Sequence, residues 1–189
     1  MGLSKIVVIE GPSGAGKDSI LQGLISKYPD IYNKPANITT REMRPGETQG
    51  NPYRFVNEKK FKKMLESGEV FEFTVRHGTY RGMSKKLIQA VIDDGKTPLI
   101  NCDMIGVEAL RGLGTFDLLT IFITAQKQDI EKRMIERGDS LDDRNKRLDD
   151  YDRHMQFEKN FDISVENKTG KLDNTIETVH RRIQKWKKC

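Results

Sequence analysis

One octet constrains this chain more than any other stretch: Gly11-Pro12-Ser13-Gly14-Ala15-Gly16-Lys17-Asp18. It follows the apolar run at 6–9 and precedes a segment whose apolar residues recur at helical spacing. Glycines allow a tight turn whose N–H groups converge on an anion, and a helix N-terminus adds partial positive charge. A glycine-rich turn of an unrelated α/β protein is the alternative, but a strand before and a helix after favour a phosphate cradle with Lys17 on the β- and γ-phosphates.

The composition is that of one large α/β domain: 189 residues, 32% charged and 35% hydrophobic. No apolar run approaches the ~18 residues of a membrane span. The first residues lead straight into the predicted strand, so we expect no signal peptide. Cys102 and Cys189 are the only cysteines, and we expect neither a structural disulfide nor a location other than the cytoplasm.

The net charge of +5 raises the question of nucleic acid as a partner. Basic residues are interleaved with 28 acids along the chain, and the one basic cluster lies at 181–188. We interpret this cluster as the solvated face of a last helix, with a nucleic-acid-binding tail as the less favoured alternative. The histidines His77, His154 and His180 are scattered and are expected to be structural or solvated.

Apolar spacing predicts a chain in which strands alternate with helices, which is typical of a parallel α/β sheet. Helices are expected after Lys17, from Asn57 to Gly68 and from Ser84 to Gly95, then around 107–110, over 126–137, from about 142 and over 172–186; strands are expected at 6–9, 70–75, 98–102, 118–123 and 163–165. In the strand at 70–75, Phe71, Phe73 and Val75 fall on one side and Glu72 on the other. The last helix carries one stripe: Leu172, Ile176, Val179, Ile183 and Trp186.

A second informative stretch is the Pro/Gly-shaped loop at 39–47, which carries Arg41 and Arg44. Two arginines three residues apart can fork around one phosphate, because their planar donors match phosphate oxygens two at a time. Tyr53 adds a hydroxyl. A solvated basic loop is the alternative, but a phosphate cradle elsewhere in the chain makes an acceptor-phosphate site plausible.

The run from Thr39 to Val56, Thr-Thr-Arg-x-x-Arg-x-Gly-Glu-x-x-Gly-x-x-Tyr-x-Phe-Val, resembles the nucleotide-monophosphate-binding signature of guanylate kinases. The likeness extends from Ile6 to Ile183. It implies a P-loop NTPase three-layer fold with a parallel central sheet, an inserted mixed or antiparallel NMP-binding subdomain and a short lid. A single domain is then expected, with a core of residues 1–36, 84–136 and 148–189, an NMP-binding region at 37–83 and a lid at 137–147.

The resemblance also implies roles for individual residues. Lys17, Arg44, Arg137 and Arg147 would be catalytic, the last two from the lid. Glu72 would accept hydrogen bonds from guanine, and Asp103 would lie at the base–sugar end of the acceptor. ATP would be bound by Gly11, Pro12, Ser13, Gly14, Ala15, Gly16, Lys17, Asp18, Ser19, Arg133 and Asn167. The acceptor would be bound by Asn37, Arg41, Arg44, Glu47, Tyr53, Glu72, Arg81, Met83 and Asp103.

Several residues depart from the pattern. Asp18 replaces the hydroxyl residue after the cradle lysine, and a carboxylate 4 Å from a phosphate charge costs roughly 4 kcal/mol at an effective dielectric of 20. We therefore hypothesise that Asp18 holds Mg²⁺; the alternative is that Ser19 or water does so and Asp18 points away. Arg81 and Met83 stand where guanylate kinases usually carry a tyrosine and a hydroxyl residue, Asn37 also replaces a hydroxyl residue, and Asn101 takes the place of an acid.

The resemblance implies ATP- and Mg²⁺-dependent phosphorylation of a purine nucleoside monophosphate, GMP or dGMP, by a monomer or homodimer whose partners are small-molecule nucleotides. Two other interpretations stay open. The Gly-Lys-Asp-Ser sequence also resembles kinases that phosphorylate ribose 1,5-bisphosphate. Less favoured is a non-catalytic guanylate-kinase-like binding module, since such modules usually lack an intact ATP cradle.

Overall fold

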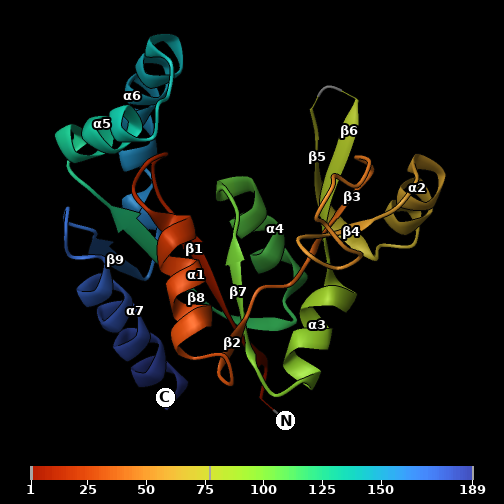
Figure 1. The fold of residues 1–189 in the computed structure, drawn as a ribbon. Helices are drawn as coiled ribbons and strands as arrows, with labels where there is room; N and C mark the ends of the chain where they lie inside the picture. The colour runs from red at the N-terminus through yellow and green to blue at the C-terminus, as the bar shows by residue number, and fades with distance from the viewer. Residues whose placement is uncertain (1, 77, 189) are drawn as a thin grey trace. The chain divides into compact units, whose positions relative to one another are not determined.

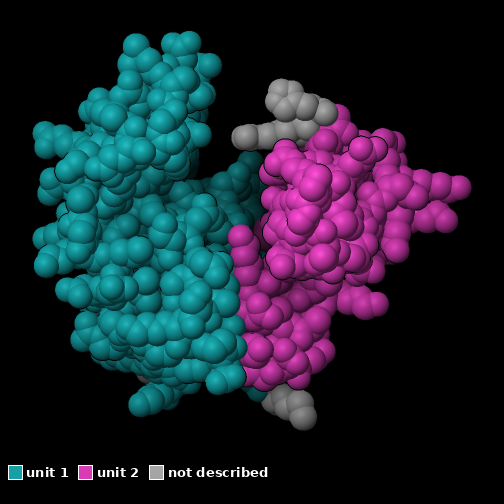
Figure 2. Space-filling view, in the orientation of Figure 1, with its two compact units in different colours: residues 1–32, 99–189 teal, residues 33–98 magenta. Residues whose placement is uncertain are grey.

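The computed structural model describes residues 2–76 and 78–188 and divides into two compact units. Unit 1 comprises Met1–Tyr32 and Leu99–Cys189, and unit 2 comprises Asn33–Pro98 (Figure 2). In chain order (Figure 1) the elements are β1 (Ser4–Glu10), α1 (Lys17–Lys27), β2 (Tyr32–Asn33), β3 (Asn37–Thr39), β4 (Tyr53–Phe55), α2 (Glu58–Glu66), β5 (Val70–Arg76), β6 (Thr79–Ser84), α3 (Lys85–Asp93), β7 (Thr97–Asn101), α4 (Met104–Leu113), β8 (Phe116–Thr124), α5 (Lys127–Glu136), α6 (Leu141–Met155), a 3₁₀ turn (Glu158–Asn160), β9 (Ile163–Glu166) and α7 (Leu172–Lys187).

A five-stranded sheet in the order β2-β7-β1-β8-β9 confirms the predicted central parallel sheet. β1 pairs in parallel with β7 and with β8, and β8 pairs in parallel with β9. Residues 6–9 of β1 are completely buried, as expected for a parallel strand covered on both faces. The carboxyl ends of β1, β7 and β8 meet at one edge, which is where ligands bind in open α/β sheets.

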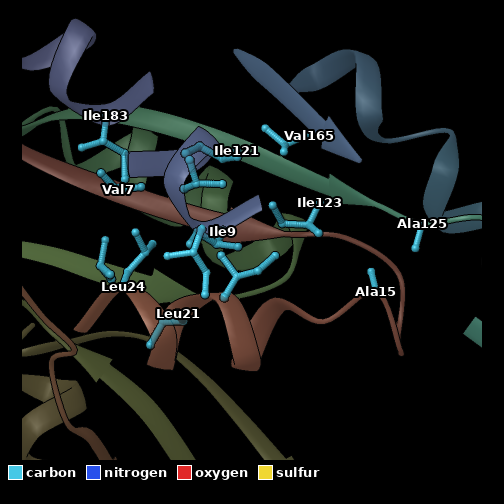
Figure 3. Packing of buried hydrophobic residues seen from close by; sticks show 14 of the residues in the cluster. Val7, Ile9, Ala15, Leu21, Leu24, Ile121, Ile123, Ala125, Val165 and Ile183 are labelled. Atoms are coloured by element: carbon cyan, nitrogen blue, oxygen red, sulfur yellow. The ribbon is translucent and has the colours of Figure 1, made fainter. Parts of the chain in front are cut away.

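Helices α1 and α7 cover one face of this sheet. Figure 3 shows Leu21 and Leu24 of α1, Ile183 of α7 and the strand residues Val7 and Ile121 in one buried cluster. The two helices approach closely at Gly23, because a Cβ there would lie 2.3 Å from Ile176 Cδ1. None of the helices in the described part of the chain combines the length and apolar character of a membrane span.

The predicted stripe of α7 is correct at all positions but one. Ile176, Val179 and Ile183 are buried and Trp186 packs against the same cluster. Leu172, however, is 39% exposed, so its assignment to the packed stripe was wrong. It is the first residue of the helix.

Unit 2 holds a four-stranded sheet in the order β4-β3-β6-β5. β3 pairs in parallel with β4 and antiparallel with β6, and β5 pairs antiparallel with β6, so the predicted mixed sheet is confirmed. Helix α2 begins after Asn57, whose side chain accepts from the Lys60 N–H as predicted for its N-cap. Phe61 and Met64 of α2 pack with Ile38 and Val70 in the core of this unit.

The two sides of β5 differ as the alternation predicted, although its apolar side is only half covered. Phe73 lies on the side of α2, with its ring centroid 6.2 Å from that of Phe61. It is nevertheless 45% exposed, and Val75 is 50% exposed. A register shift between Val70 and Glu72 interrupts the strand pairing next to these residues.

We expect the core of unit 2 to depend on Phe61. Phe61→Ala removes a completely buried ring and should lower the free energy of unfolding by about 3–5 kcal/mol, measured by urea titration. Phe73→Ala, the matched control on the neighbouring half-exposed ring, should cost about 1 kcal/mol. Equal losses for the two variants would contradict this description of the core.

Candidate active site

The glycine-rich loop between β1 and α1 lies tightly against β8. Gly11 has φ +148°, and a Cβ at this position would lie 2.1 Å from the Ile123 carbonyl oxygen. The Ala15 N–H closes the turn by donating to the Pro12 carbonyl at 3.1 Å. Gly16 precedes α1 at φ +95° without a side-chain cap, so the first turn of the helix presents backbone N–H groups that suit an anion.

Two residues from distant elements support this loop from outside. Asn167, only 4% exposed, donates from Nδ2 to the Ala15 carbonyl at 2.8 Å and accepts from Thr175 Oγ1 at 3.2 Å. Arg133 donates to the Ala15 carbonyl at 3.2 Å and to the Asn167 carbonyl at 2.7 Å. The resemblance implied that Arg133 and Asn167 bind ATP; their contacts with the loop backbone are an additional role that the sequence pattern did not indicate.

Lys17 and the loop border a cavity of about 330 Å³ within unit 1. The Lys17 ammonium donates to the carbonyls of Gly11 and Pro12, the latter at 3.0 Å, and burial lowers its pKa. The cavity is lined by Ser13, Gly14, Gly16, Lys17, Asp18, Ser19, Arg133, Met134 and Arg137. The structure thus brings together most of the predicted ATP-binding residues with one of the two lid arginines.

Glu10, which the motif did not single out, is a buried carboxyl at the end of β1. It is 8% exposed and accepts a hydrogen bond from the Gly11 N–H. Burial, with a smaller contribution from Asp103, raises the pKa of Glu10 to about 7 against the opposing effects of Lys17 and the Gly11 N–H. The available signal was an acid that ends an otherwise apolar strand directly before the loop.

Asp18 is exposed in the first turn of α1 and contacts the end of β7. Its Oδ1 accepts from Asn101 Nδ2 at 3.0 Å. The departures at 18 and 101 are therefore in direct contact. One carboxylate oxygen and the adjacent Ser19 hydroxyl are hard ligands of the kind that Mg²⁺ prefers, so the residues present fit this metal.

Asp103 follows β7 and caps α4. Its carboxylate accepts from the Gly106 N–H at 3.1 Å, while the residue stays exposed. It belongs to unit 1, unlike the other predicted acceptor-binding residues, which belong to unit 2.

The predicted lid arginines meet at one carboxylate. Arg137 donates from Nε to Asp139 Oδ1 at 2.8 Å and from a second nitrogen to Oδ2, and Arg147 donates to Oδ2 at 2.8 Å. Asp139 lies in the turn between α5 and α6, and its pKa is lowered first by the hydrogen bonds from Arg137.

Strand pairing in unit 2 brings the predicted acceptor-binding residues to one face of its sheet. Glu72 lies opposite Met83, Arg81 lies opposite Thr39, and Asn37 lies beside Tyr53. Because directly paired residues project to the same side, these residues share the face opposite to α2. Met83 is only 5% exposed, whereas Arg81 is exposed.

Arginines and an aromatic ring gather on this face. The guanidinium carbons of Arg41 and Arg81 lie 5.6 and 5.5 Å from the centre of the Tyr53 ring. Glu47 holds Arg41 with bonds of 2.7 and 3.0 Å and accepts from the Arg44 N–H at 2.8 Å. Glu47 therefore fixes the bend of the arginine loop, while the Arg44 residue is exposed.

Two of the three histidines lie among the described residues, and His180 has the structural role that was expected. His180 stacks on Tyr28 at a centroid distance of 3.8 Å and contacts Tyr32 Oη at 2.9 Å, a structural arrangement. Burial lowers the pKa of His154. His77 and Cys189 lie outside the described residues.

A parallel sheet, a glycine loop at the carboxyl end of its first strand and a lysine at the start of the following helix define a P-loop NTPase fold. A crystal structure of guanylate kinase from Anaplasma phagocytophilum shows the same fold, with a TM-score of 0.65 over 97% of this chain and 86% of that one at 19% identity.

The guanylate kinase family model matches residues 3–186, so the chain belongs to the guanylate kinase family. Among similar proteins, a guanylate kinase from Trichormus variabilis is 32% identical over 165 residues, 86% of this chain and 82% of that protein. One from Chlamydia trachomatis is 37% identical over 139 residues, 74% of this chain and 67% of that protein.

We expect the buried carboxyl group of Glu10 to make the stability of the protein depend on pH. A pKa of about 7 instead of 4.5 means that the folded protein holds this proton more tightly than the unfolded chain. The contribution of Glu10 to the free energy of unfolding is complete below pH 4.5 and is lost as the pH rises through 7. The total loss is about 3 kcal/mol.

Glu10→Gln removes this titration. The free energy of unfolding of the variant relative to the natural protein should therefore rise between about pH 5 and pH 8, measured by urea unfolding. Glu131→Gln, which removes an exposed carboxylate on α5, serves as the control and should give a flat difference. A flat difference for Glu10→Gln as well would show that Glu10 does not titrate near neutrality.

Proposed function

We propose that this chain transfers the γ-phosphoryl group of ATP to GMP or dGMP, giving ADP and GDP or dGDP. The observation that carries the proposal is the cavity in which the glycine loop, Lys17, Arg133 and Arg137 converge. Membership of the family and relatives named guanylate kinase support the same activity.

In the proposed reaction, an oxygen of the acceptor phosphate attacks the γ-phosphorus as the bond to the β–γ bridging oxygen breaks. Phosphoryl transfer needs alignment and charge stabilisation rather than a covalent intermediate. Loop N–H groups and Lys17 would hold the donor phosphates, and Arg137 and Arg147 would stabilise the transferred group. Arg41, Arg44 and Tyr53 would hold the acceptor phosphate.

For the acceptor base, the proposal gives Glu72 the recognition of guanine. A carboxylate accepts both hydrogen bonds that the N1 and N2 groups of guanine donate. The buried thioether of Met83 lies opposite Glu72 and offers no comparable donor to the guanine carbonyl, which leaves Asn37 on the same face as the candidate. Residues 37–83 would then form the acceptor-binding region, 137–147 the lid and the remainder the core.

Mg²⁺ belongs to the proposal as the ion that neutralises the donor phosphates, with Asp18 as its protein ligand. Support comes from the exposed carboxylate in the wall of the cavity and from its bond to Asn101, which orients it. Bound there, Mg²⁺ would supply charge stabilisation for the phosphates beside Asp18. A cytoplasmic enzyme with small-molecule nucleotides as its partners completes the proposal.

The acceptor decides between this proposal and its alternatives. With ATP and Mg²⁺, GMP and dGMP should exceed AMP, IMP and ribose 1,5-bisphosphate in kcat/KM by about tenfold or more, measured in a coupled ADP-release assay. Glu72→Gln should lower kcat/KM for GMP by about 10- to 100-fold, because it replaces a charged acceptor of two hydrogen bonds.

Glu66→Gln, at the exposed end of α2, is the matched control and should leave the rate unchanged. Preference for ribose 1,5-bisphosphate would favour the second kind of kinase. ATP binding without any transfer would indicate a binding module, and failure with every purine monophosphate would refute the proposal.

The metal ligand is tested separately. Asp18→Asn keeps the shape of the side chain and removes its charge, so the Mg²⁺ concentration for half-maximal rate should rise by about tenfold or more. Asp129→Asn removes a carboxylate from the first turn of α5 and should not shift the Mg²⁺ titration. The same Mg²⁺ dependence and turnover in Asp18→Asn and the natural protein would discard Asp18 as the ligand.

A further inference from the structure

The turn between α5 and α6 presents one carboxylate to two arginines. Asp139 has a side chain that is 13% exposed, whereas the side chains of Arg137 and Arg147 are 54% and 39% exposed. Its two oxygens receive three hydrogen bonds from these arginines. Two guanidinium groups held this close would repel each other without the negative charge between them.

The backbone of Asp139 is fixed from both sides. Its N–H donates to the Met134 carbonyl at 3.0 Å, at the end of α5, after Gly138 has turned the chain with φ +82°. Directly after it, Ser140 caps α6 by accepting from the Asp143 N–H at 3.2 Å. The backbone that carries this carboxylate is therefore held between the end of α5 and the start of α6.

The contacts leave most arginine donors available. A guanidinium carries five N–H donors, of which Asp139 engages two on Arg137 and one on Arg147. Arg137 lines the cavity of Lys17. Arg147 is not among the residues that line this cavity. Its bond to Asp139 keeps it next to Arg137, which does line the cavity.

We infer that Asp139 is a positioning residue that holds Arg137 and Arg147 together as one preformed clamp for the transferred phosphoryl group. This inference rests on the proposed function and adds a residue to it. In the proposed reaction Asp139 contacts no reacting atom; it acts through the two arginines, whose free donors remain for phosphate oxygens.

The test begins with Asp139→Asn, which keeps the size of the side chain and removes its charge. We expect kcat with ATP, Mg²⁺ and GMP to fall by about tenfold or more, because the arginines stabilise charge in the transition state. The dissociation constant for ATP, measured by calorimetry without acceptor, should change by less than about threefold. Asp142→Asn removes an exposed carboxylate three residues away and should leave both quantities unchanged.

A cycle separates positioning from mere structural support. If Asp139 acts only through the arginines, adding Asp139→Asn to Arg137→Gln/Arg147→Gln should change kcat by less than about threefold. If Asp139→Asn proves too unstable to assay, Asp139→Glu keeps the charge but displaces the oxygens. It should then lower kcat with a melting temperature near that of the natural protein.

The other possible results overturn either this inference or the proposed function. Asp139→Asn with the kinetics of Asp142→Asn would overturn the inference while leaving the proposed function intact. So would an undiminished loss when the arginines are already absent. If Asp139→Asn cannot be assayed, an Asp139→Glu variant with unchanged kcat would overturn it as well. An inactive natural protein would instead overturn the proposed function, and this inference with it.

Discussion

The close approach of the glycine loop to β8 is the constraint on which the rest of the site depends. The Ile123 carbonyl occupies the space of a Cβ on Gly11, and Asn167 Nδ2 occupies that of a Cβ on Gly16. The loop therefore takes its course only with glycine at both ends. That course places Lys17 at the start of α1 and leaves the first N–H groups of the helix uncapped, which creates the anion site from backbone alone.

Carboxylates pair with several of the cations that are predicted to bind phosphate, in each of the two units. Glu10 is close enough to Lys17 for each to oppose the burial effect on the pKa of the other, Glu47 holds Arg41, and Asp139 holds Arg137 and Arg147. Isolated arginines and lysines of like charge would spread apart and lose side-chain order. Pairing keeps them in place with part of their positive charge compensated, so less rearrangement is needed when a phosphate binds.

The sequence predicted the helices, strands and loops around the site better than the tertiary contacts that hold them. Local signals sufficed where they were strong: the octet before α1, the Asn57 cap of α2 and the alternation around Glu72 all correspond to observed elements. Contacts between distant segments left no such trace. The bonds from Arg133 and Asn167 to the loop join residues more than a hundred positions apart, and the exposure of Leu172 depends on where α7 begins relative to the core.

Two departures from the family pattern become one feature once the fold is known. Considered separately, Asp18 adds a negative charge next to the glycine loop, and Asn101 removes a negative charge from the end of β7. In the structure these side chains are joined at 3.0 Å, with the amide as donor and the carboxylate as acceptor. Two carboxylates at this distance would repel, and two neutral groups would leave no charge for a cation. The pair thus keeps one negative charge at this corner of the cavity and fixes its orientation, which neither residue achieves alone.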